Sequence, residues 1–580
     1  MNDQRNMILA IVLSAFVLFG WGIASDKLFP QHKAAPQASA PSATEAAPAL
    51  PGAVATAPSD VLRDRTIVLA ATPRVKIDTP RLAGSINLVG ARIDDLVLRN
   101  YKETIKKDSG EVRLLSPSGA KSAYFAEFGW LGEGFKRPDS NSVWTADKQV
   151  LTPDSPVTLT HNNKAGQLFT IVVSIDKNFM FNLKQSVANQ SAGTIAVRSF
   201  GLLSRAGHSP DQSTWTHHAG PMAVFNGAAN YDLDYKEMDE GETLSKNSTG
   251  GWLGYTDKYW LTALIPNQQA NVAGRFTLSG PERYQADITP AAATLLGAGK
   301  TLTNETRFFA GAKEVSLLES YQNEGGVTQF DKSIDWGWFY WFEKPIFYTL
   351  DWLFRMLGNF GVAIIALTFI IRGLMFPVAQ RQFRSMAAMR VLQPKVKQLQ
   401  ERYKDDKATL QQEMMALYQK EKVNPFAGCM PILIQVPVFY ALYKVLTLTI
   451  EMRHQPFALW LHDLSAPDPL TPLNLFGLLD FTPPSFMALG VLPILLGITM
   501  YLQFKLNPAP MDPVQQQVFS LMPWILMFVM APFAAGLQLY WVVSNIFTIA
   551  QQKFLYSRYP GIKAETDKPA SEKTVEGKTR

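Results

Sequence analysis

Long apolar runs near both ends of the chain constrain its fold more than any other feature. Met7–Ala24 is almost continuously apolar over 18 residues, and further apolar runs follow after about residue 350. A helix needs roughly 20 predominantly apolar residues to cross the hydrocarbon core of a bilayer. The mean hydropathy of the 580 residues is nevertheless near zero, because a polar region separates the runs. This pattern predicts a multi-span α-helical membrane protein with one large water-soluble domain.

The apolar runs predict six transmembrane helices. Arg5 precedes Met7–Ala24, and no small-residue cleavage motif follows it, which favours an uncleaved anchor over 1–25 rather than a signal peptide. The C-terminal spans are expected near 356–377, 427–450, 486–505, 518–532 and 536–554. The fifth of these is short and depends on a bent or tilted neighbour.

The distribution of lysine and arginine predicts the orientation. The segment 378–424 contains ten of these residues, whereas 451–485 contains only Arg453, and the tail 558–580 is again rich in lysine. Basic loops remain on the cytoplasmic side. We therefore expect both termini and the 378–424 segment in the cytoplasm, and the large domain outside, which in a bacterium is the periplasm.

The region between the spans divides into three parts. Residues 26–61 are rich in Ala, Pro and Ser, as a flexible linker would be. Over 62–330, short alternating runs such as QLFTIVVSID are separated by turn residues, which predicts a large antiparallel β-sandwich. Residues 331–355 carry many tryptophans and tyrosines, a composition typical of an amphipathic helix lying at a membrane interface; these aromatics are Trp336, Trp338, Tyr340, Trp341, Tyr348 and Trp352.

The basic segment 378–424 predicts a hairpin of two amphipathic helices. Apolar residues recur there at helical spacing, with a turn near 404–407. The hairpin is either a connector whose apolar stripe closes on itself or a binding surface for other proteins. Its many methionines support the second interpretation without deciding between the two, because soft, unbranched side chains adapt to varied apolar partners. The candidate binding residues are Met386, Met389, Arg390, Met414 and Met415.

Arg372 lies in an apolar run in which eleven of the thirteen residues from 364 to 376 are apolar, counting glycine. An arginine at membrane depth costs roughly 2.5–3.5 kcal/mol on insertion scales. Its side chain either snorkels to the nearby water surface or lines a wet cavity. The second interpretation is favoured by other polar residues in the spans, which are Thr368, Gln435, Tyr540, Ser544 and Thr548.

Several segments resemble the YidC/Oxa/Alb family of membrane protein insertases. They are RGLMFP, MRVLQPKVKQLQERY, EMMALYQKEKVNPFAGCMPILIQVPVFYALY, APFALWLHDLSAPDP and GLQLYWVVSNIFTIAQQ. The order of anchor, large outer domain and five further spans resembles the Gram-negative bacterial branch. The resemblance is specific over 336–557 and rests on architecture elsewhere.

The resemblance implies an insertase core over 356–557, in which a hydrophilic groove helps nascent proteins enter the inner membrane. The family's groove arginine corresponds to Arg372, its groove threonine to Thr368 and its polar third-span residue to Gln435. A tyrosine pair common in the last span is here Tyr540–Trp541. The resemblance also implies a β-supersandwich akin to sugar-binding enzymes, without their chemistry. The implied partners are nascent membrane proteins, the Sec translocon, the signal recognition particle receptor, the ribosome and membrane lipid, with no direct contact to nucleic acid.

Other function classes find little support. The single cysteine, Cys429, permits no intramolecular disulfide. The GAGKT sequence at 297–301 lacks the first glycine of a phosphate-binding loop and predicts a turn. The His217–His218 pair and the acidic segment 232–242 indicate a solvated loop. We expect no cofactor, no metal and no enzymatic activity; a small-anion transporter or channel using Arg372 is the alternative, although no inverted repeat supports it.

Overall fold

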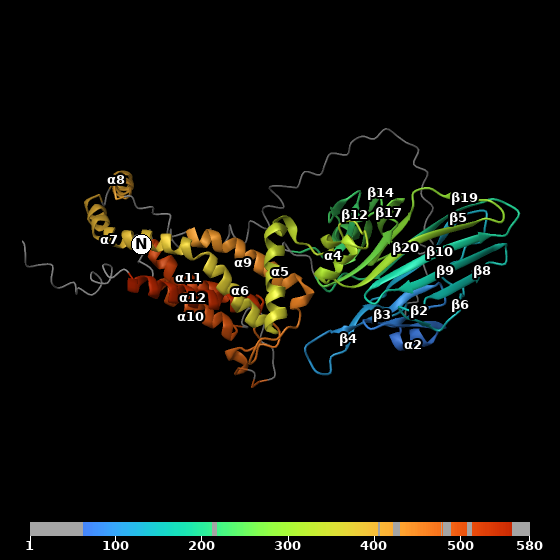
Figure 1. Cartoon of the computed structure of the whole chain (residues 1–580), viewed down its shortest axis with the longest axis horizontal. Coiled ribbons are helices and arrows are strands. Elements are labelled where there is room, and N and C mark those ends of the chain that lie inside the picture. The colour runs from blue at the N-terminus through green and yellow to red at the C-terminus, as the bar shows by residue number, and fades with distance from the viewer. Residues whose placement is uncertain are drawn as a thin grey trace, which may run out of the picture.

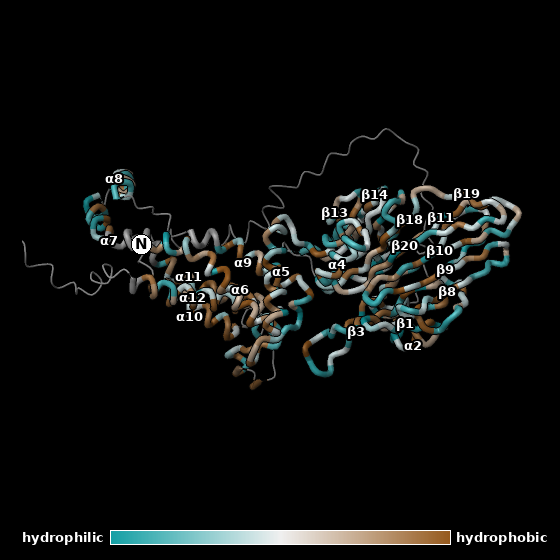
Figure 2. Tube along the Cα trace, in the orientation of Figure 1, coloured by the Kyte–Doolittle hydropathy of each residue, from teal (hydrophilic) through white to brown (hydrophobic). Residues whose placement is uncertain are grey.

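A computed structural model describes residues 62–211, 217–403, 406–421, 430–476, 478–479, 489–506 and 513–558. The anchor expected over 1–25, the linker over 26–61, Cys429 and nearly all of the tail over 558–580 lie outside the described residues. The described chain forms a β domain followed by a helical part (Figure 1). Figure 2 shows apolar residues predominating along the helices from α9 to α12 and in α6.

The β domain consists of two large, mainly antiparallel sheets, which confirms the predicted all-β sandwich. One parallel pair, β1 with β7, departs from that prediction. The first sheet has the order β14 (Leu244–Thr249), β17 (Asn271–Leu278), β18 (Arg283–Pro290), β11 (Ile195–Ala206), β5 (Tyr124–Glu133), β3 (Arg92–Lys102), β2 (Leu82–Asn87), β1 (Arg74–Asp78) and β7 (Val150–Leu151), with β19 (Thr294–Leu296) beside β11 and β4 (Glu111–Leu115) beside β3.

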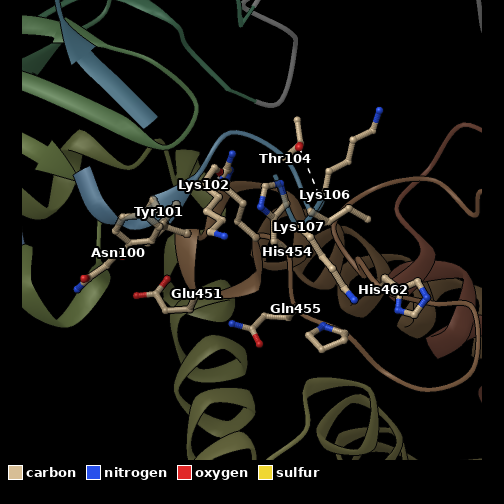
Figure 3. A pocket seen from close by; sticks show the side chains of 14 residues that line it. Asn100, Tyr101, Lys102, Thr104, Lys106, Lys107, Glu451, His454, Gln455 and His462 are labelled. Carbon is tan, nitrogen blue, oxygen red and sulfur yellow. Dashed lines mark hydrogen bonds between the residues drawn. The ribbon is translucent and has the colours of Figure 1, made fainter. Parts of the chain in front are cut away.

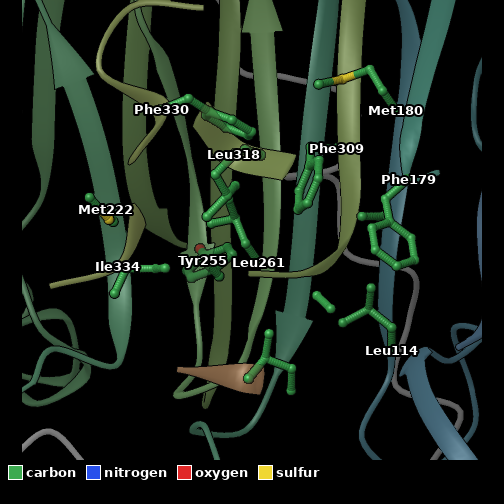
Figure 4. Packing of buried hydrophobic residues seen from close by; sticks show 14 of the residues in the cluster. Leu114, Phe179, Met180, Met222, Tyr255, Leu261, Phe309, Leu318, Phe330 and Ile334 are labelled. Atoms are coloured by element: carbon green, nitrogen blue, oxygen red, sulfur yellow. The ribbon is translucent and has the colours of Figure 1, made fainter. Parts of the chain in front are cut away.

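The second sheet has the order β13 (Ala228–Asn230), β12 (Gly220–Phe225), β15 (Trp252–Thr256), β16 (Trp260–Pro266), β20 (Thr301–Ala312), β10 (Met180–Asn189), β9 (Gln167–Ile175), β8 (Val157–Asn162) and β6 (Thr145–Ala146). Along β9, buried and half-buried side chains alternate, because successive side chains of a strand point to opposite faces. Aromatic side chains such as Phe179, Phe309 and Phe330 fill the core (Figure 4).

Short helices and loops complete the domain. The helices are α2 (Arg65–Ala70), α3 (Tyr235–Asp239) and α4 (Val315–Asn323), followed by the 3₁₀ turns η2 (Phe330–Ser333) and η3 (Gly337–Phe339). The 297–300 segment connects β19 to β20, so GAGKT leads into a strand rather than a helix. The acidic segment 232–242 contains α3, because Asp234 and Glu237 form a reciprocal cap at its start.

The helical part begins with α5 (Tyr340–Leu357), which contacts α6 (Phe360–Leu374) and α9 (Met430–Leu448). Between α6 and α9 lie α7 (Phe376–Arg402) and α8 (Lys407–Lys420). After α9 come η5 (Ile450–Met452), η6 (Pro472–Asn474), α10 (Val491–Leu506), α11 (Pro513–Met530) and α12 (Ala535–Arg558). The three last helices pack together, and α12 also contacts α6 and α9.

The six predicted transmembrane helices are not confirmed. In the described ranges no single helix is both long enough and apolar enough to cross a bilayer; only α6 together with Phe376–Phe383 of α7 meets the criterion, with a 56° bend between them. Val491–Leu506 and Gln517–Met530 are shorter apolar helices. The bend precedes Pro377, whose ring and missing N–H are incompatible with an uninterrupted helix.

The aromatic helix α5 has one buried and one exposed face. Ile346, Phe347, Leu350 and Leu353 are buried, while Trp341, Tyr348 and Trp352 are exposed. Trp336, which we expected on the exposed aromatic face, precedes the helix and is buried because it packs edge-on against Phe347, with a ring-centroid distance of 6.0 Å.

Candidate functional site

The position of α6, which carries Arg372, is determined by the turn that precedes it. Gly358 ends α5 with a φ of +71°, a conformation that glycine adopts without a steric cost. Asn359 then caps α6, since its side chain accepts the N–H of Val362 at 3.1 Å and donates to the Phe457 carbonyl at 2.8 Å. Phe354 and Phe360 stack across this turn. The turn therefore fixes α6 against both α5 and the loop after α9.

Arg372 extends from α6 to α12. Its Nε donates to the Ser544 hydroxyl at 3.0 Å, and its Nη2 donates to the same oxygen. Arg372 is half-buried, whereas Ser544 is buried. Within the described part of the chain, Arg372 forms no ion pair. The structure thus holds a guanidinium among apolar helices with a neutral acceptor and no counter-charge.

Gln435 extends the polar contacts to a third helix. Its side-chain amide in α9 donates to the Tyr540 hydroxyl in α12 at 2.5 Å. Tyr540 lies one helical turn before Ser544 and is buried. We call Arg372, Gln435, Tyr540 and Ser544 the Arg372 cluster. It brings together predicted site residues from three helices that are more than sixty positions apart in the chain.

The other predicted residues lie beside the cluster. Thr368 is fully buried, and its hydroxyl donates to the Ile364 carbonyl of its own helix at 2.7 Å. Thr548 likewise donates to the Ser544 carbonyl at 2.8 Å. Trp541 is half-buried and packs against Phe439, with ring centroids 4.9 Å apart.

The helices that carry the Arg372 cluster, and their neighbours α10 and α11, expose large apolar side chains. Phe369 and Leu374 of α6 and Val436 of α9 are 56%, 77% and 57% exposed, respectively. On α10 to α12, further large apolar side chains are exposed, among them Leu502, Ile525, Phe528 and Ile546. Extended apolar surfaces of this kind are rare on proteins surrounded by water alone. The partly buried cluster thus lies among helices whose outward faces are apolar.

The helical hairpin of α7 and α8 has a small core of its own. Leu392, Val396 and Tyr418 are buried together, and Met414 packs against them. Met415 is 46% exposed and faces outward. The side chains of Met386, Met389 and Arg390 lie outside the described part of the structure. The hairpin's apolar stripe therefore closes partly on itself, while at least one methionine remains on the surface.

Two groups of buried polar residues were not predicted from the sequence. Lys444 of α9 is buried, and its ammonium donates to the Asp335 carbonyl at 2.7 Å, near the buried carboxylate of Glu343 on α5. Burial raises the pKa of Glu343 to about 7. In addition, Asn545 of α12 donates to the Thr499 hydroxyl of α10 at 3.2 Å. Both residues could have been recognised in the sequence, because each is a polar residue in an otherwise apolar run. The lysine lies within ALYKVLTL and the asparagine within WVVSNIF.

Comparison with known proteins gives consistent matches over nearly the whole chain. Residues 352–563 match the family described as 60Kd inner membrane protein, and residues 74–349 match the YidC periplasmic domain. The protein named membrane protein insertase YidC from Zymomonas mobilis subsp. mobilis is 47% identical over 564 residues, which cover 96% of each chain. The protein of the same name from Methylorubrum extorquens is 44% identical, covering 97% of this chain and 96% of that one.

Among solved structures, an active YidC insertase with its first transmembrane domain resolved is 17% identical in sequence and has a TM-score of 0.35. The match covers 82% of this chain and 92% of that chain.

Proposed function

This chain belongs to the YidC family of membrane protein insertases, and we propose that the Arg372 cluster is the place where polar parts of its substrates cross the membrane. It is an inner-membrane protein with a periplasmic all-β domain, its substrates are nascent membrane proteins, and it is not an enzyme. Its relatives give no support to an anion transporter or channel.

The observation that carries the proposal is the uncompensated charge of Arg372. A guanidinium has several N–H donors, and here one serine hydroxyl accepts from two of its nitrogens. The remaining donors require water or a ligand, because an unpartnered polar group in hydrocarbon costs several kcal/mol. Water beside Arg372 shortens the apolar distance that the polar tail of a substrate has to cross. An acidic residue of that tail pairs transiently with Arg372.

The exposed apolar side chains beside the cluster have the complementary role. The transmembrane helix of a substrate slides along Phe369, Leu374 and Val436 toward lipid while its polar tail passes the Arg372 cluster. The driving force is the burial of the substrate's own apolar surface, without bond chemistry. Half-buried Trp541 forms part of the wall of this path, and Thr368, which is fully buried, lies behind it.

The remaining organisation follows from the basic segments of the sequence. We propose six spans with both termini in the cytoplasm: an anchor over 1–25, a linker over 26–61, a periplasmic domain over 62–330, an interfacial helix over 331–355, a core over 356–557 and a tail over 558–580. The hairpin over 378–424 then receives substrates, the ribosome or the signal recognition particle receptor. The Sec translocon is a further proposed partner.

Reconstitution tests the proposed function directly. The purified full chain in proteoliposomes is expected to insert a small, freshly synthesised membrane protein, which is scored by protection of its translocated tail from protease. Empty liposomes and proteoliposomes with Arg372→Glu serve as controls. A parallel measurement of chloride and phosphate flux separates the two functions, because anion flux without insertion would make the chain a channel.

A further inference from the structure

A cleft of about 650 Å³ lies where the β domain meets the loop after α9 (Figure 3). One wall is the hairpin that connects β3 to β4, and the other wall is the loop from Ile450 to His462. Arg453 joins the two walls, since its guanidinium donates to the carbonyls of Lys102 at 2.8 Å and Glu103 at 3.1 Å. These hydrogen bonds therefore fix the two walls of the cleft, which are far apart in the sequence, relative to each other.

The cleft carries an excess of positive charge. Lys102, Lys106 and Lys107 line it from the hairpin, and none of their ammonium groups forms an ion pair with a described residue. Glu451 is the only carboxylate in the lining, and it already accepts the backbone N–H of Val315 at 2.9 Å. The lining therefore holds three lysines and one carboxylate, a charge balance that favours an anionic ligand.

The position of the cleft indicates the kind of anion. The loop from Ile450 to His462 begins directly after α9 ends at Leu448. In the proposed orientation this wall of the cleft therefore lies at the periplasmic end of an apolar helix. Ile105 on the hairpin is 53% exposed, and Leu459 on the loop is 83% exposed. Lysines beside exposed aliphatic side chains are typical of surfaces that contact anionic lipid at a membrane interface.

We propose that this cleft binds the phosphate headgroup of an anionic phospholipid at the periplasmic surface of the inner membrane. The inference rests on the orientation given under the proposed function. Lys107, which extends between His454 and His462 in Figure 3, and Lys102 provide the charge. Ile105 and Leu459 contact the acyl region. An acidic protein segment would satisfy the lysines equally, but it would give no reason for the exposed aliphatic side chain of Ile105 between them.

Native mass spectrometry of the full chain in detergent micelles tests the proposal, with phosphatidylglycerol and phosphatidylcholine added at matched concentrations. The wild-type chain is expected to retain phosphatidylglycerol preferentially. Lys102→Gln and Lys107→Gln are each expected to weaken that retention by about fivefold. Lys121→Gln is the matched control, because Lys121 is an exposed lysine of the same domain that does not line the cleft, and it is expected to change little.

Three results would overturn the proposal. Equal retention of both lipids by the wild-type chain would show that the cleft does not select anionic lipid. Equal losses from Lys121→Gln and Lys107→Gln would show diffuse attraction rather than a site. Binding of a glutamate-rich peptide that depends on Lys107, without preference for phosphatidylglycerol, would replace the lipid by a protein partner. Because no substrate is present, a failure of insertion in proteoliposomes leaves this measurement unaffected.

The side of the membrane is tested separately. Ile105→Cys in a Cys429→Ser background is expected to react with a membrane-impermeant maleimide added outside intact spheroplasts. Reaction only after the cytoplasmic side is opened would contradict the periplasmic position of the cleft.

Discussion

Arg372 and Ser544 show how a single hydroxyl can hold a charge at a defined place among apolar helices. The guanidinium donates to Ser544 through two nitrogens, while Gln435 and Tyr540 form the neighbouring contact. A side chain that only reached for the water surface would not need an acceptor on another helix. The cross-helix contact therefore favours a fixed functional position for Arg372 over snorkelling.

Replacing Ser544 by alanine tests this contact. Ser544→Ala removes the acceptor of Arg372, and we expect it to lower the insertion rate by about tenfold, which corresponds to roughly 1.4 kcal/mol, the value of one hydrogen bond. The matched control is Thr548→Ala, because the Thr548 hydroxyl donates only to the Ser544 carbonyl of its own helix. Insertion is measured in proteoliposomes at equal protein content. Equal losses in both variants would mean that helix packing, not the Arg372 contact, was disturbed.

The buried side chain of Glu451 predicts that the contact between the β domain and the helical part depends on pH. We call this contact, between Glu451 and Val315, the junction. Burial raises its pKa from 4.5 to about 7, with further upward contributions from Glu314 and Asp351, while the Val315 N–H acts in the opposite direction. A raised pKa means that the folded junction binds the proton more tightly than the open one. The stability of the junction is therefore greatest below about pH 4.5 and falls as the pH rises through 7.

Amide hydrogen exchange at Val315, corrected for intrinsic rates, measures this effect. We expect protection of that amide to fall between pH 5 and pH 8 in the wild-type chain and to stay nearly constant in Glu451→Gln, which remains neutral. The same slope in both chains would remove Glu451 as the titrating group.

At the scale of elements, two neighbouring methionines in the hairpin of α7 and α8 have different environments. Met414 packs against Leu392, Val396 and Tyr418, whereas Met415 is exposed. Met414→Ser is expected to destabilise the hairpin, which limited proteolysis of the loop near 403–406 would detect. Met415→Ser is expected to leave the hairpin intact and to reduce photo-crosslinking to nascent chains. Undiminished crosslinking in folded Met415→Ser would leave the hairpin as a connector.

Periodicity made several elements predictable. The alternation in QLFTIVVSID became β9, and the helical spacing over 378–424 became α7 and α8. The bend between α6 and α7 was not predicted, although Pro377 marks its place, because a hydropathy pattern contains no angle. Trp336 was misplaced because its partner Phe347 is a tertiary contact. Strand order was likewise beyond local reasoning, since β11 pairs with both β5 and β18.

The site residues were predictable as types but not as partners. A polar residue in an apolar run stands out in the sequence, and Arg372, Gln435 and Ser544 were found in this way. That Gln435 contacts Tyr540, while Thr368 bonds to its own helix, depends on how α6, α9 and α12 rotate against one another. Lys444 was missed because its acceptor, Asp335, lies before α5, more than one hundred positions away.

At the scale of the whole molecule, the β domain and the helical part meet through several polar contacts. These include Val315 with Glu451, and Arg453 with Lys102 and Glu103. Lys344 of α5 also forms ion pairs with Glu319 and Asp331, but the helix itself packs directly on α6 and α9. We therefore predict that deleting 62–320 while keeping 321–354 preserves insertion at close to the full-length rate. A stably expressed, correctly oriented truncation without activity would assign the β domain an essential role.

The most direct test of the account is the insertion of two matched substrates by chains with Arg, Lys, Gln or Glu at position 372. One substrate has an acidic N-terminal tail, and in the other the acidic residues are neutralised. If Arg372 lines a wet path, Arg372→Glu is expected to impair the acidic substrate most, and Arg372→Lys to substitute in part, because lysine keeps the charge but lacks the planar fork. A cysteine at 372, in a Cys429→Ser background, is expected to react with a water-soluble maleimide. Equal effects on both substrates, together with an unreactive cysteine, would contradict the account and leave snorkelling as the role of Arg372.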